Sequence, residues 1–473
     1  MPELVFDVAI IGGGPAGYTA AIRGSQYKQK TVLIESGGRL GGTCLHAGCI
    51  PTKALLFNAE IWDHFKRAAD YGIAGIGTPQ LDWAAVQKRK NAIVGKHTKG
   101  LEFLMRKNNV TVIDGWGRLT GPAKDGLHIV NVTGAGGEVQ SLTSRNVILA
   151  TGSEARTLFD LQPDDRLLTS IEILAIDRPP KSMIVIGAGA VGVEFSSIFR
   201  SFGTNVAIVE YLPRIVPSED EDVSKELTRV FRKRGIDVNA ACIVQKVERT
   251  EGGVKVTWID ASGKSVEKEA EKVLFAIGRA PRTVSLGIES TKIGLDGGFV
   301  KVNEMQQTAE PGIYAIGDIV AGLPQLAHVG SMSGLVAMAK IADRPFRPVL
   351  RDRIPSCTYT DPQIGSIGLT EAQAKERGYE LKVGKFPFAG NSKATIVDSH
   401  DGFVKVVSNA LNSEILGVHI IGPHATELIA EAVAHMELGG TIDKLIYTIH
   451  AHPTLSEAML EAYASVEAMS INM

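Results

Sequence analysis

The chain has 473 residues, and its 50 basic and 52 acidic side chains give a formal net charge of −2 at pH 7. This length predicts several packed domains, and a content of 44% hydrophobic and 22% charged residues is ordinary for a globular protein and excludes a disordered one. No block of Lys and Arg follows the sequence, so we expect neither nucleic acid nor an anionic membrane surface as a partner.

No segment has the features of a membrane span or a targeting signal. The longest apolar run, residues 183–195, contains three glycines and Glu194 and is too short to cross a bilayer. The first residues lack the basic flank and apolar core of a signal peptide, and four cysteines are too few for a disulfide scaffold. We therefore expect a cytoplasmic protein.

The first chemical motif follows an apolar run at residues 6–11. Gly12, Gly14 and Gly17 have G-x-G-x-x-G spacing and precede a helix-like segment and a second apolar run that ends at Glu35. In such a βαβ unit the first glycine allows a tight turn, the second lets the backbone approach a pyrophosphate, and the third permits close packing of helix on strand. The closing glutamate can accept hydrogen bonds from an adenosine ribose.

Two cysteines five positions apart follow in GGTCLHAGCIPTKALL, residues 41–56. On one regular helix the Cα atoms of Cys44 and Cys49 would lie about 8 to 9 Å apart, beyond the reach of a disulfide. A bond between them would require a distorted helix start, which Gly48 and Pro51 permit. The pattern fits a catalytic pair, a metal site or two incidental thiols.

A zinc site at this pair would need two more ligands at suitable spacing. His46 lies between the cysteines, but Cys242 and Cys357 are distant single residues typical of small buried hydrophobes. Lys53 lies one helical turn after Cys49, so both side chains would share a face, where a cation is useful beside a thiolate or a flavin. A solvated lysine is the simpler alternative.

The first motif recurs later in the chain. Gly187, Gly189 and Gly192 follow an apolar run, and a second run ends at Glu210; the first glycine and the closing glutamate both lie 175 positions after their counterparts (187 − 12 and 210 − 35). A single motif of this kind is weak evidence, but two with the same surroundings predict that the chain binds two dinucleotides.

Three apolar strands stop at Ala-x-Gly. They end at Thr151 and Gly152, at Gly278, and before Asp318, which is positioned to bind a hydroxyl of the first cofactor. We interpret them as crossings of the chain between domains. The predicted segments are 1–152 (first nucleotide-binding domain, first part), 153–275 (second nucleotide-binding domain), 276–346 (second part of the first and central domain) and 347–473 (C-terminal domain); the resemblance described below implies FAD for the first, NAD for the second and the dimer interface for the last.

Two histidines lie near the end of the chain in HAHPTLSEA. Pro453 favours an extended backbone at His452, and no carboxylate lies beside His450 and His452 to complete a metal site. Thr454 and Glu457 have the spacing of a helix capping box, so the glutamate could serve the helix or the histidine.

These motifs together resemble the flavoprotein disulfide reductase family along essentially the whole chain, and most closely its members that oxidise dihydrolipoamide. The motifs are GGGPAGYTAAIR, GGTCLHAGCIPTKALL, VILATGS, GAGAVGVEF, FAIGRAPR, AIGDI, LAH and HAHPTLSEA. The resemblance implies an α/β fold with two Rossmann-like domains, for FAD and for NAD, and an α+β C-terminal dimerisation domain.

The resemblance also implies roles for individual residues. Cys49 would be the charge-transfer thiolate over the flavin and Cys44 the interchange thiol that attacks the substrate, while Lys53 would lie beside the flavin, paired with Glu194. The helix that starts at Ala327 would direct its positive N-terminus to the flavin. FAD would bind to Gly12, Gly14, Gly17, Glu35, Lys53, Thr151, Gly152, Asp318 and Ala327, and NAD to Gly187, Gly189, Gly192, Glu210 and Gly278.

In the family the histidine that matches His452 is the acid and base for the cysteines of the other subunit, so the resemblance implies a homodimer, with Glu457 orienting the ring. The substrate would be dihydrolipoamide on the lipoyl domains of a 2-oxo acid dehydrogenase complex or of the glycine cleavage system. Alternatives are an NADPH-dependent disulfide reductase of the glutathione type and a non-enzymatic flavin redox sensor. Glu210 favours NAD, although Arg214 would suit the 2′-phosphate of NADP.

Overall fold

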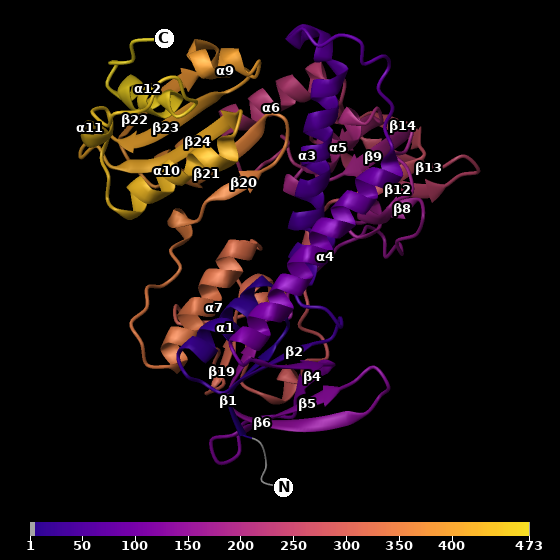
Figure 1. The fold of residues 1–473 in the computed structure, drawn as a ribbon, viewed down its shortest axis with the longest axis vertical. Coiled ribbons are helices and arrows are strands. Elements are labelled where there is room, and N and C mark those ends of the chain that lie inside the picture. Colours follow the sequence, from indigo (N-terminus) through magenta and orange to yellow (C-terminus); the bar gives the residue numbers. More distant parts are fainter. Residues whose placement is uncertain (1–4, 473) are drawn as a thin grey trace. The chain divides into compact units, whose positions relative to one another are not determined.

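The computed structural model of the protein describes residues 5–472. The chain forms two compact units, each built from separate segments (Figure 1). The first unit contains Met1–Ala54, Ala85–Arg156 and Arg279–Val349, and the second contains Leu55–Ala84, Thr157–Gly278 and Leu350–Met473. Two long helices, α3 (Cys49–Lys66) and α4 (Trp83–Lys107), pass from one unit to the other.

The first unit is built on a seven-stranded sheet with the order β3-β2-β1-β6-β5-β4 and β19 added on β6. Its strands are β1 (Val5–Ile11), β2 (Thr31–Glu35), β3 (Thr111–Asp114), β4 (Trp116–Leu119), β5 (His128–Thr133), β6 (Val139–Leu149) and β19 (Ile313–Ala315). The strands β1, β2, β3, β6 and β19 run parallel, and apolar side chains are buried on both faces of the sheet. Burial on both faces explains why β1 and β2 are continuous apolar runs in the sequence.

The helices of the first unit include α1 (Pro15–Gln26), α2 (Gly42–Ala47) and α7 (Ala327–Ile341), and α1 packs along α7. Two small antiparallel ladders complete the unit: β7 (Ser153–Ala155) with β16 (Arg279–Pro281), and β17 (Leu295–Asp296) with β18 (Phe299–Val300). The β7–β16 ladder joins the two points at which the chain leaves and re-enters this unit.

In the second unit, a parallel five-stranded sheet has the order β11-β10-β9-β15-β8. Its elements are β8 (Leu167–Leu168), β9 (Ser182–Ile186), α5 (Ala190–Ser201), β10 (Asn205–Val209), α6 (Glu221–Lys233), β11 (Asp237–Asn239) and β15 (Lys272–Phe275). An antiparallel sheet of β12 (Ile243–Arg249), β13 (Val254–Ile259) and β14 (Ser265–Ala270) is inserted before β15. The order β9, α5, β10 repeats the β1, α1, β2 of the first unit.

The C-terminal part of the second unit is an antiparallel sheet with the order β20-β21-β24-β23-β22. Its elements are β20 (Ser356–Thr358), β21 (Gln363–Gly368), α8 (Glu371–Glu376), β22 (Leu381–Pro387), α9 (Ser392–Ile396), β23 (Phe403–Asn409), β24 (Ile415–Gly422), α10 (Ala425–Glu437), α11 (Ile442–Leu445) and α12 (Glu457–Val466). The helices α10 and α12 pack on the sheet and bury a common apolar core. The predicted fold class is confirmed, while the domain boundaries at 152, 275 and 346 stay predictions.

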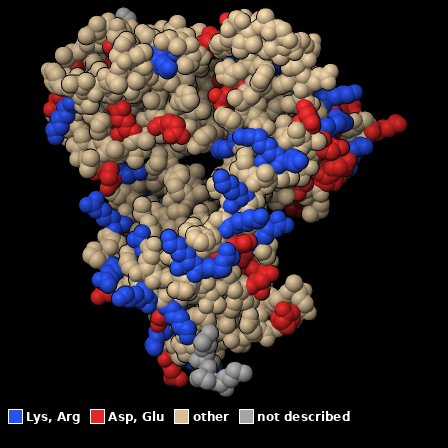
Figure 2. Space-filling model, viewed as in Figure 1, with Lys and Arg blue, Asp and Glu red and all other residues tan. Residues whose placement is uncertain are grey.

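The helix α4 collects basic side chains on one face. Its 25 residues include seven Lys or Arg and one acidic residue, Glu102. Six of the seven are exposed and fall within an arc of about 100° around the helix axis: Lys88, Arg89, Lys96, Lys99, Arg106 and Lys107. Figure 2 shows Lys and Arg side chains gathered over α4. A chain whose charges nearly cancel therefore still presents a basic strip. Among the described residues, no helix combines the length and apolarity that a bilayer span requires.

Candidate active site and cofactor sites

The first glycine motif forms the turn between β1 and α1. A Cβ atom at Gly12, where φ is +113°, would lie 2.2 Å from the carbonyl oxygen of Ala150, and one at Gly17 would lie 1.8 Å from the carbonyl oxygen of Gly12. At Gly14 the nearest atom would be the Cα of Gly42, at 3.9 Å. The first and third glycines are therefore required by the fold itself, whereas the second leaves open space at the N-terminus of α1, where an anion is stabilised.

The second motif repeats this arrangement between β9 and α5. A Cβ atom at Gly187, where φ is +99°, would lie 2.4 Å from the carbonyl oxygen of Ala276, and one at Gly192 would lie 2.0 Å from that of Gly187. A Cβ atom at Gly189 would meet nothing within 4 Å. In both turns the second glycine thus leaves open space, and its predicted role in binding a pyrophosphate stays a prediction.

The two closing glutamates are held in the same way. The Oε2 atom of Glu35 accepts a hydrogen bond from the backbone N–H of Gly13 at 2.7 Å, and that of Glu210 accepts one from Ala188 at 2.5 Å. In both carboxylates the Oε1 atom accepts a second bond from the N–H two positions further along. These bonds fix each carboxylate beside its glycine loop, and the predicted role in ribose recognition stays a prediction.

Arg214 had raised the alternative of an NADP 2′-phosphate. Its Nη2 atom instead donates to the backbone carbonyl oxygens of Pro217 at 3.1 Å and Glu219 at 3.3 Å. The guanidinium group is therefore engaged by its own loop, which favours NAD.

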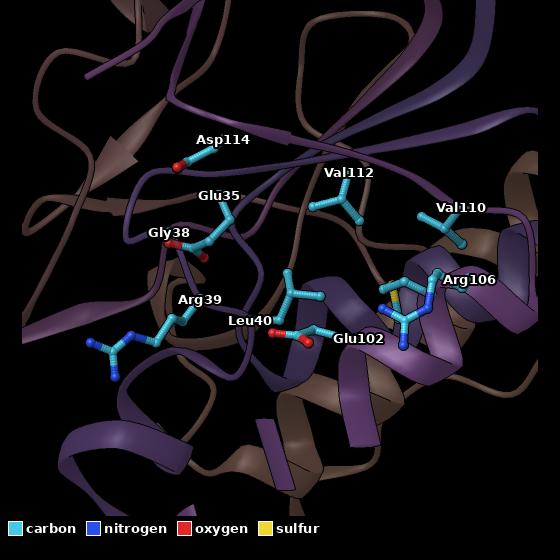
Figure 3. Close-up of a pocket in the computed structure, with 10 residues that line it drawn as sticks. Glu35, Gly38, Arg39, Leu40, Glu102, Arg106, Val110, Val112 and Asp114 are labelled. Atoms are coloured by element: carbon cyan, nitrogen blue, oxygen red, sulfur yellow. The ribbon is translucent and has the colours of Figure 1, made fainter. Parts of the chain in front are cut away.

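A cavity of about 300 Å³ lies beside the closing glutamate of the first motif. Figure 3 shows Glu35 and Asp114, at the ends of β2 and β3, across from Glu102 and Arg106 of α4. The loop residue Leu40 forms part of the wall between them. The volume of the cavity is in the range of small-molecule sites, and Glu35, the residue predicted to bind the ribose of FAD, forms part of its wall.

The two cysteines lie on successive helices. Cys44 is in α2, Gly48 breaks the helical path with φ −150° and ψ −118°, and Cys49 begins α3. Both are free thiols, and the pKa of the Cys44 thiol is raised by its hydrogen bond with the Cys49 sulfur and by burial. The two thiol side chains are therefore hydrogen-bonded to each other, and the break at Gly48 is a distortion of the kind that a bond between them would require. Their pairing as a disulfide stays a prediction.

A partly buried arginine near the cysteines was missed by the sequence analysis. Arg279 donates from Nε to Ser153 Oγ at 2.6 Å and from Nη2 to the Ser153 carbonyl at 2.7 Å and to Thr43 Oγ1 at 3.4 Å. Burial lowers its pKa, opposed by the charges of Asp318 and Cys49. Ser153 in turn donates to Asp318 at 2.5 Å. The only signal in the sequence was a cation directly after an Ala-x-Gly strand.

The other predicted cofactor residues lie at element ends. The Oγ1 atom of Thr151 donates to the carbonyl oxygen of Arg282 at 2.6 Å. Gly152 and Gly278 both have positive φ, and a Cβ atom at either would meet nothing within 4 Å. Ala327 is the first residue of α7. These positions are compatible with a bound cofactor, and their roles stay predictions.

The predicted pairing of Lys53 with Glu194 joins residues of different units. Lys53 lies on α3, one turn after Cys49, in the first unit. Glu194 lies buried on α5 in the second, where its Oε1 atom accepts a bond from the N–H of Tyr359 at 2.9 Å. The pairing stays a prediction.

The C-terminal histidine and glutamate form a hydrogen-bonded pair. The Nδ1 atom of His452 lies 2.9 Å from Glu457 Oε1, and the N–H of Thr454 donates to Oε2 of the same carboxylate at 2.7 Å. Burial would raise the pKa of Glu457, but the bonds from Thr454 and His452 lower it overall. The glutamate is then ionised at neutral pH and can only accept, so Nδ1 carries the proton and Nε2 is free to act as a base.

The second histidine of the motif has a different partner. The Nε2 atom of His450 lies 3.1 Å from Glu431 of α10, and its Nδ1 atom lies 2.9 Å from the carbonyl oxygen of Thr448. Both ring nitrogens are occupied, whereas the side chain of His452 is 71% exposed. Of the two histidines, His452 therefore has the free nitrogen that acid and base catalysis needs.

Comparison with known proteins agrees with this geometry. Residues 6–334 match the model of a pyridine nucleotide-disulphide oxidoreductase, and residues 354–463 match the dimerisation domain of the same proteins. The chain belongs to the pyridine nucleotide-disulphide oxidoreductase family. The second match supports the predicted homodimer, because this family's dimerisation domain is present in the chain.

Individual members of the family are similar over nearly the full length. The dihydrolipoyl dehydrogenase of Bacillus subtilis is 41% identical over 474 residues, 99% of both chains, and that of Rhizobium etli is 40% identical over 472 residues, 97% of both. The crystal structure of LpdA from Mycobacterium tuberculosis has a TM-score of 0.88 and 28% identity, over 97% of this chain and 99% of that one.

Proposed function

We propose that the protein is a dihydrolipoyl dehydrogenase, a flavoprotein oxidoreductase that transfers electrons from dihydrolipoamide to NAD⁺. The observation that carries the proposal is the hydrogen bond between the Cys44 and Cys49 side chains in a chain with two glycine turns of the dinucleotide-binding type. Relatives of this name at 38–41% identity over nearly the whole chain support it.

The cofactors are FAD and NAD, and the residues present fit both. FAD would be held by the open turn at Gly14, the carboxylate of Glu35 with the cavity beside it, Asp318, and the N-terminus of α7. NAD would be held by the open turn at Gly189 and by Glu210. FAD, when bound, accepts two electrons from the cysteine pair and passes them to NAD⁺ as a hydride.

The cysteines carry the exchange with the substrate. In the oxidised enzyme Cys44 and Cys49 share a disulfide, and a substrate thiolate attacks the Cys44 sulfur so that Cys49 leaves as a thiolate. The second substrate thiolate then attacks the sulfur bound to Cys44, lipoamide is released as a cyclic disulfide, and both cysteines are left reduced. Arg279 supplies positive charge that stabilises the thiolate of Cys49, and the charge of Lys53 favours the thiolate of Cys44.

The pair of His452 and Glu457 moves the protons. With Nδ1–H held by Glu457, the Nε2 atom of His452 accepts a proton from each substrate thiol before it attacks. Burial of the imidazolium by a partner subunit would strengthen its attraction to the carboxylate. We propose that His452 serves the cysteines of the other subunit in the homodimer.

The natural substrate would be a dihydrolipoyl group on the lipoyl domain of a 2-oxo acid dehydrogenase complex or of the glycine cleavage system. The cytoplasmic location stays a prediction. The alternatives are an NADPH-dependent disulfide reductase, against which the engagement of Arg214 by its own loop argues, and a redox sensor, which would not need the His452–Glu457 pair.

The test is to mix the purified flavoprotein with dihydrolipoamide and follow reduction of NAD⁺ and NADP⁺ in parallel. Rapid NADH formation with little NADPH is the expected result. A protein that holds flavin but reduces neither nucleotide would contradict the proposal and direct attention to other disulfide substrates with NADPH as donor.

A further inference from the structure

The C-terminal sheet contains a lysine that is buried almost completely. The side chain of Lys405, on β23, is 3% exposed, and its Nζ atom lies 2.8 Å from Asp220, 2.8 Å from Glu371 and 3.1 Å from Asp222. Glu371 begins α8 of the same sheet domain, whereas the two aspartates lie at the start of α6, in the nucleotide-binding fold. The lysine therefore connects two parts of the second unit.

Asp220 is the centre of this connection. Its side chain caps α6 by accepting the N–H of Asp222 at 3.0 Å, and it also accepts the N–H of Glu371 at 3.2 Å and the ammonium group of Lys405. The carboxylate is 2% exposed, so these bonds are protected from water. Donors from three different elements thus define its position.

The loop that ends at Asp220 contacts the second glycine turn. The N–H of Val216 donates to the carbonyl oxygen of Ala188 at 2.8 Å, and the N–H of Glu219 donates to the carbonyl oxygen of Val216 at 2.9 Å. Val216 has a φ of +40°, which a β-branched residue rarely adopts, so the loop must be held from outside. The Asp220 end supplies such an anchor.

Ala188 lies between Gly187 and Gly189, the position where the predicted NAD pyrophosphate approaches the backbone. Its N–H is bound by Glu210 at 2.5 Å and its carbonyl oxygen by Val216. The orientation of the two peptide groups that flank Ala188 therefore depends on both ends of the segment from Glu210 to Asp220. One end is the glutamate predicted to bind the ribose, and the other is Asp220.

We propose that Lys405 is a positioning residue for NAD: its ion pair with Asp220 fixes the loop that orients the second glycine turn. This inference rests on the proposed function only in that NAD binds at this turn. A side chain of the dimerisation domain then contributes to nucleotide affinity without touching the nucleotide.

Simple loss of charge balance is the competing explanation for any effect of removing Lys405. In Lys405→Met, Asp222 keeps Lys385 at 3.3 Å and Glu371 keeps Lys375 at 2.5 Å, so Asp220 is the carboxylate left buried and unbalanced. The double variant K405M/D220N removes that charge, while the asparagine still caps the helix. It leaves no unpaired charge, and it lacks the ion pair together with the bond from the N–H of Glu371, because an amide nitrogen cannot accept.

The experiment measures the dissociation constant of NADH by titration calorimetry on the flavin-loaded wild type, K405M, K405M/D220N and the control K382M, each fully reduced beforehand with dithionite so that NADH binds without being oxidised. Lys382 pairs with Glu467 at the surface of the neighbouring strand β22, so K382M should bind NADH as the wild type does. We expect NADH to bind about tenfold more weakly to both K405M and K405M/D220N, as one lost positioning interaction would give. Flavin content and reduction of the cysteines by dihydrolipoamide should not change.

Wild-type affinity in K405M/D220N would overturn the inference, and this variant decides the matter if K405M alone does not fold. An equal loss of NADH affinity in K382M would also overturn it, because the effect would not be specific to the buried pair. The readout is independent of dihydrolipoamide: a wild type that binds NADH but does not oxidise dihydrolipoamide refutes the proposed function and leaves this inference open to the same measurement.

Discussion

Replacement of Glu457 by glutamine tests the proton transfer directly, because the carboxylate has a different donor on each oxygen. Oε1 accepts from His452 and Oε2 from the N–H of Thr454. A glutamine amide has one oxygen and one NH₂ group, so it cannot accept both bonds. If the amide oxygen takes the N–H of Thr454, the NH₂ group faces Nδ1, and the ring must move its proton to Nε2, where it can no longer act as a base.

The alternative orientation keeps the active tautomer but leaves the N–H of Thr454 facing a donor. An unsatisfied, partly buried N–H costs about 1–3 kcal/mol, which corresponds to a population of the active form reduced roughly 5- to 150-fold. Because the pair is partly exposed in the single chain, we expect Glu457→Gln to lower kcat for dihydrolipoamide oxidation about tenfold. The midpoint of thermal unfolding should change little.

The assay compares two reactions of each variant. Oxidation of dihydrolipoamide by NAD⁺ requires the histidine, whereas oxidation of NADH by an artificial one-electron acceptor bypasses it and serves as the internal control. Glu461→Gln is the matched variant, since Glu461 lies one turn further along α12 and binds the C-terminal residues Ser470 and Asn472. Equal kcat in Glu457→Gln and the wild type, or an equal loss in both reactions, would refute the assigned role.

Four further variants test other parts of the protein. Cys44→Ser should abolish dihydrolipoamide oxidation while the protein retains FAD, and loss of flavin on purification would contradict the assigned division of roles. Gly189→Ala should fold normally and raise KM for NAD⁺ about tenfold, because its Cβ atom fills only the space left for the nucleotide. Gly192→Ala should instead lower the midpoint of thermal unfolding, because its Cβ atom would lie 2.0 Å from a backbone oxygen. Glu219→Gln should stabilise the protein at neutral pH by about 1–3 kcal/mol, since burial raises the pKa of Glu219 and its Oε2 atom has no partner among the described residues. Because the pKa of Glu219 is higher in the folded than in the unfolded protein, where it is 4.5, the wild type loses stability as the pH rises above 4.5. Urea unfolding should therefore show a higher stability of Glu219→Gln than of the wild type at neutral pH, and no difference below pH 4.5.

The glycine motifs could be predicted from sequence because their requirements are local. The turn at Gly12 needs a positive φ, and Gly17 must lie against the backbone of that turn, so both requirements are set by a spacing of a few residues. The repeat at Gly187 and Gly192 shares the offset of 175 positions and has the same contacts. Local backbone geometry of this kind can be read directly from residue type and spacing.

The role of Glu457 could not be decided from sequence, since two patterns compete for the same residue. The capping-box spacing from Thr454 predicted a helix cap, and the resemblance predicted a partner for His452. In the structure the helix starts at Glu457 with Ser456 as its N-cap, so Thr454 is not the cap residue. The prediction of a helix cap at Thr454 is therefore wrong, but the carboxylate accepts the N–H of Thr454 on one oxygen and the histidine proton on the other, so both contacts occur together.

The roles of charged residues that bond to distant parts of the chain could not be predicted from the sequence. Arg279 and Lys405 each follow or interrupt an apolar strand and, taken alone, resemble ordinary surface cations. Their partners, Ser153 and Asp220, are 126 and 185 positions away in the chain. A buried cation is stable only where such partners contact it, because an isolated buried charge is energetically costly. This cost implies that a partner exists, but it does not tell which residue of the sequence that partner is. Lys405 illustrates the consequence: the residue expected to set nucleotide affinity lies in the dimerisation domain, outside both glycine motifs, and only the bonds through Asp220 and the loop after Glu210 connect it to them.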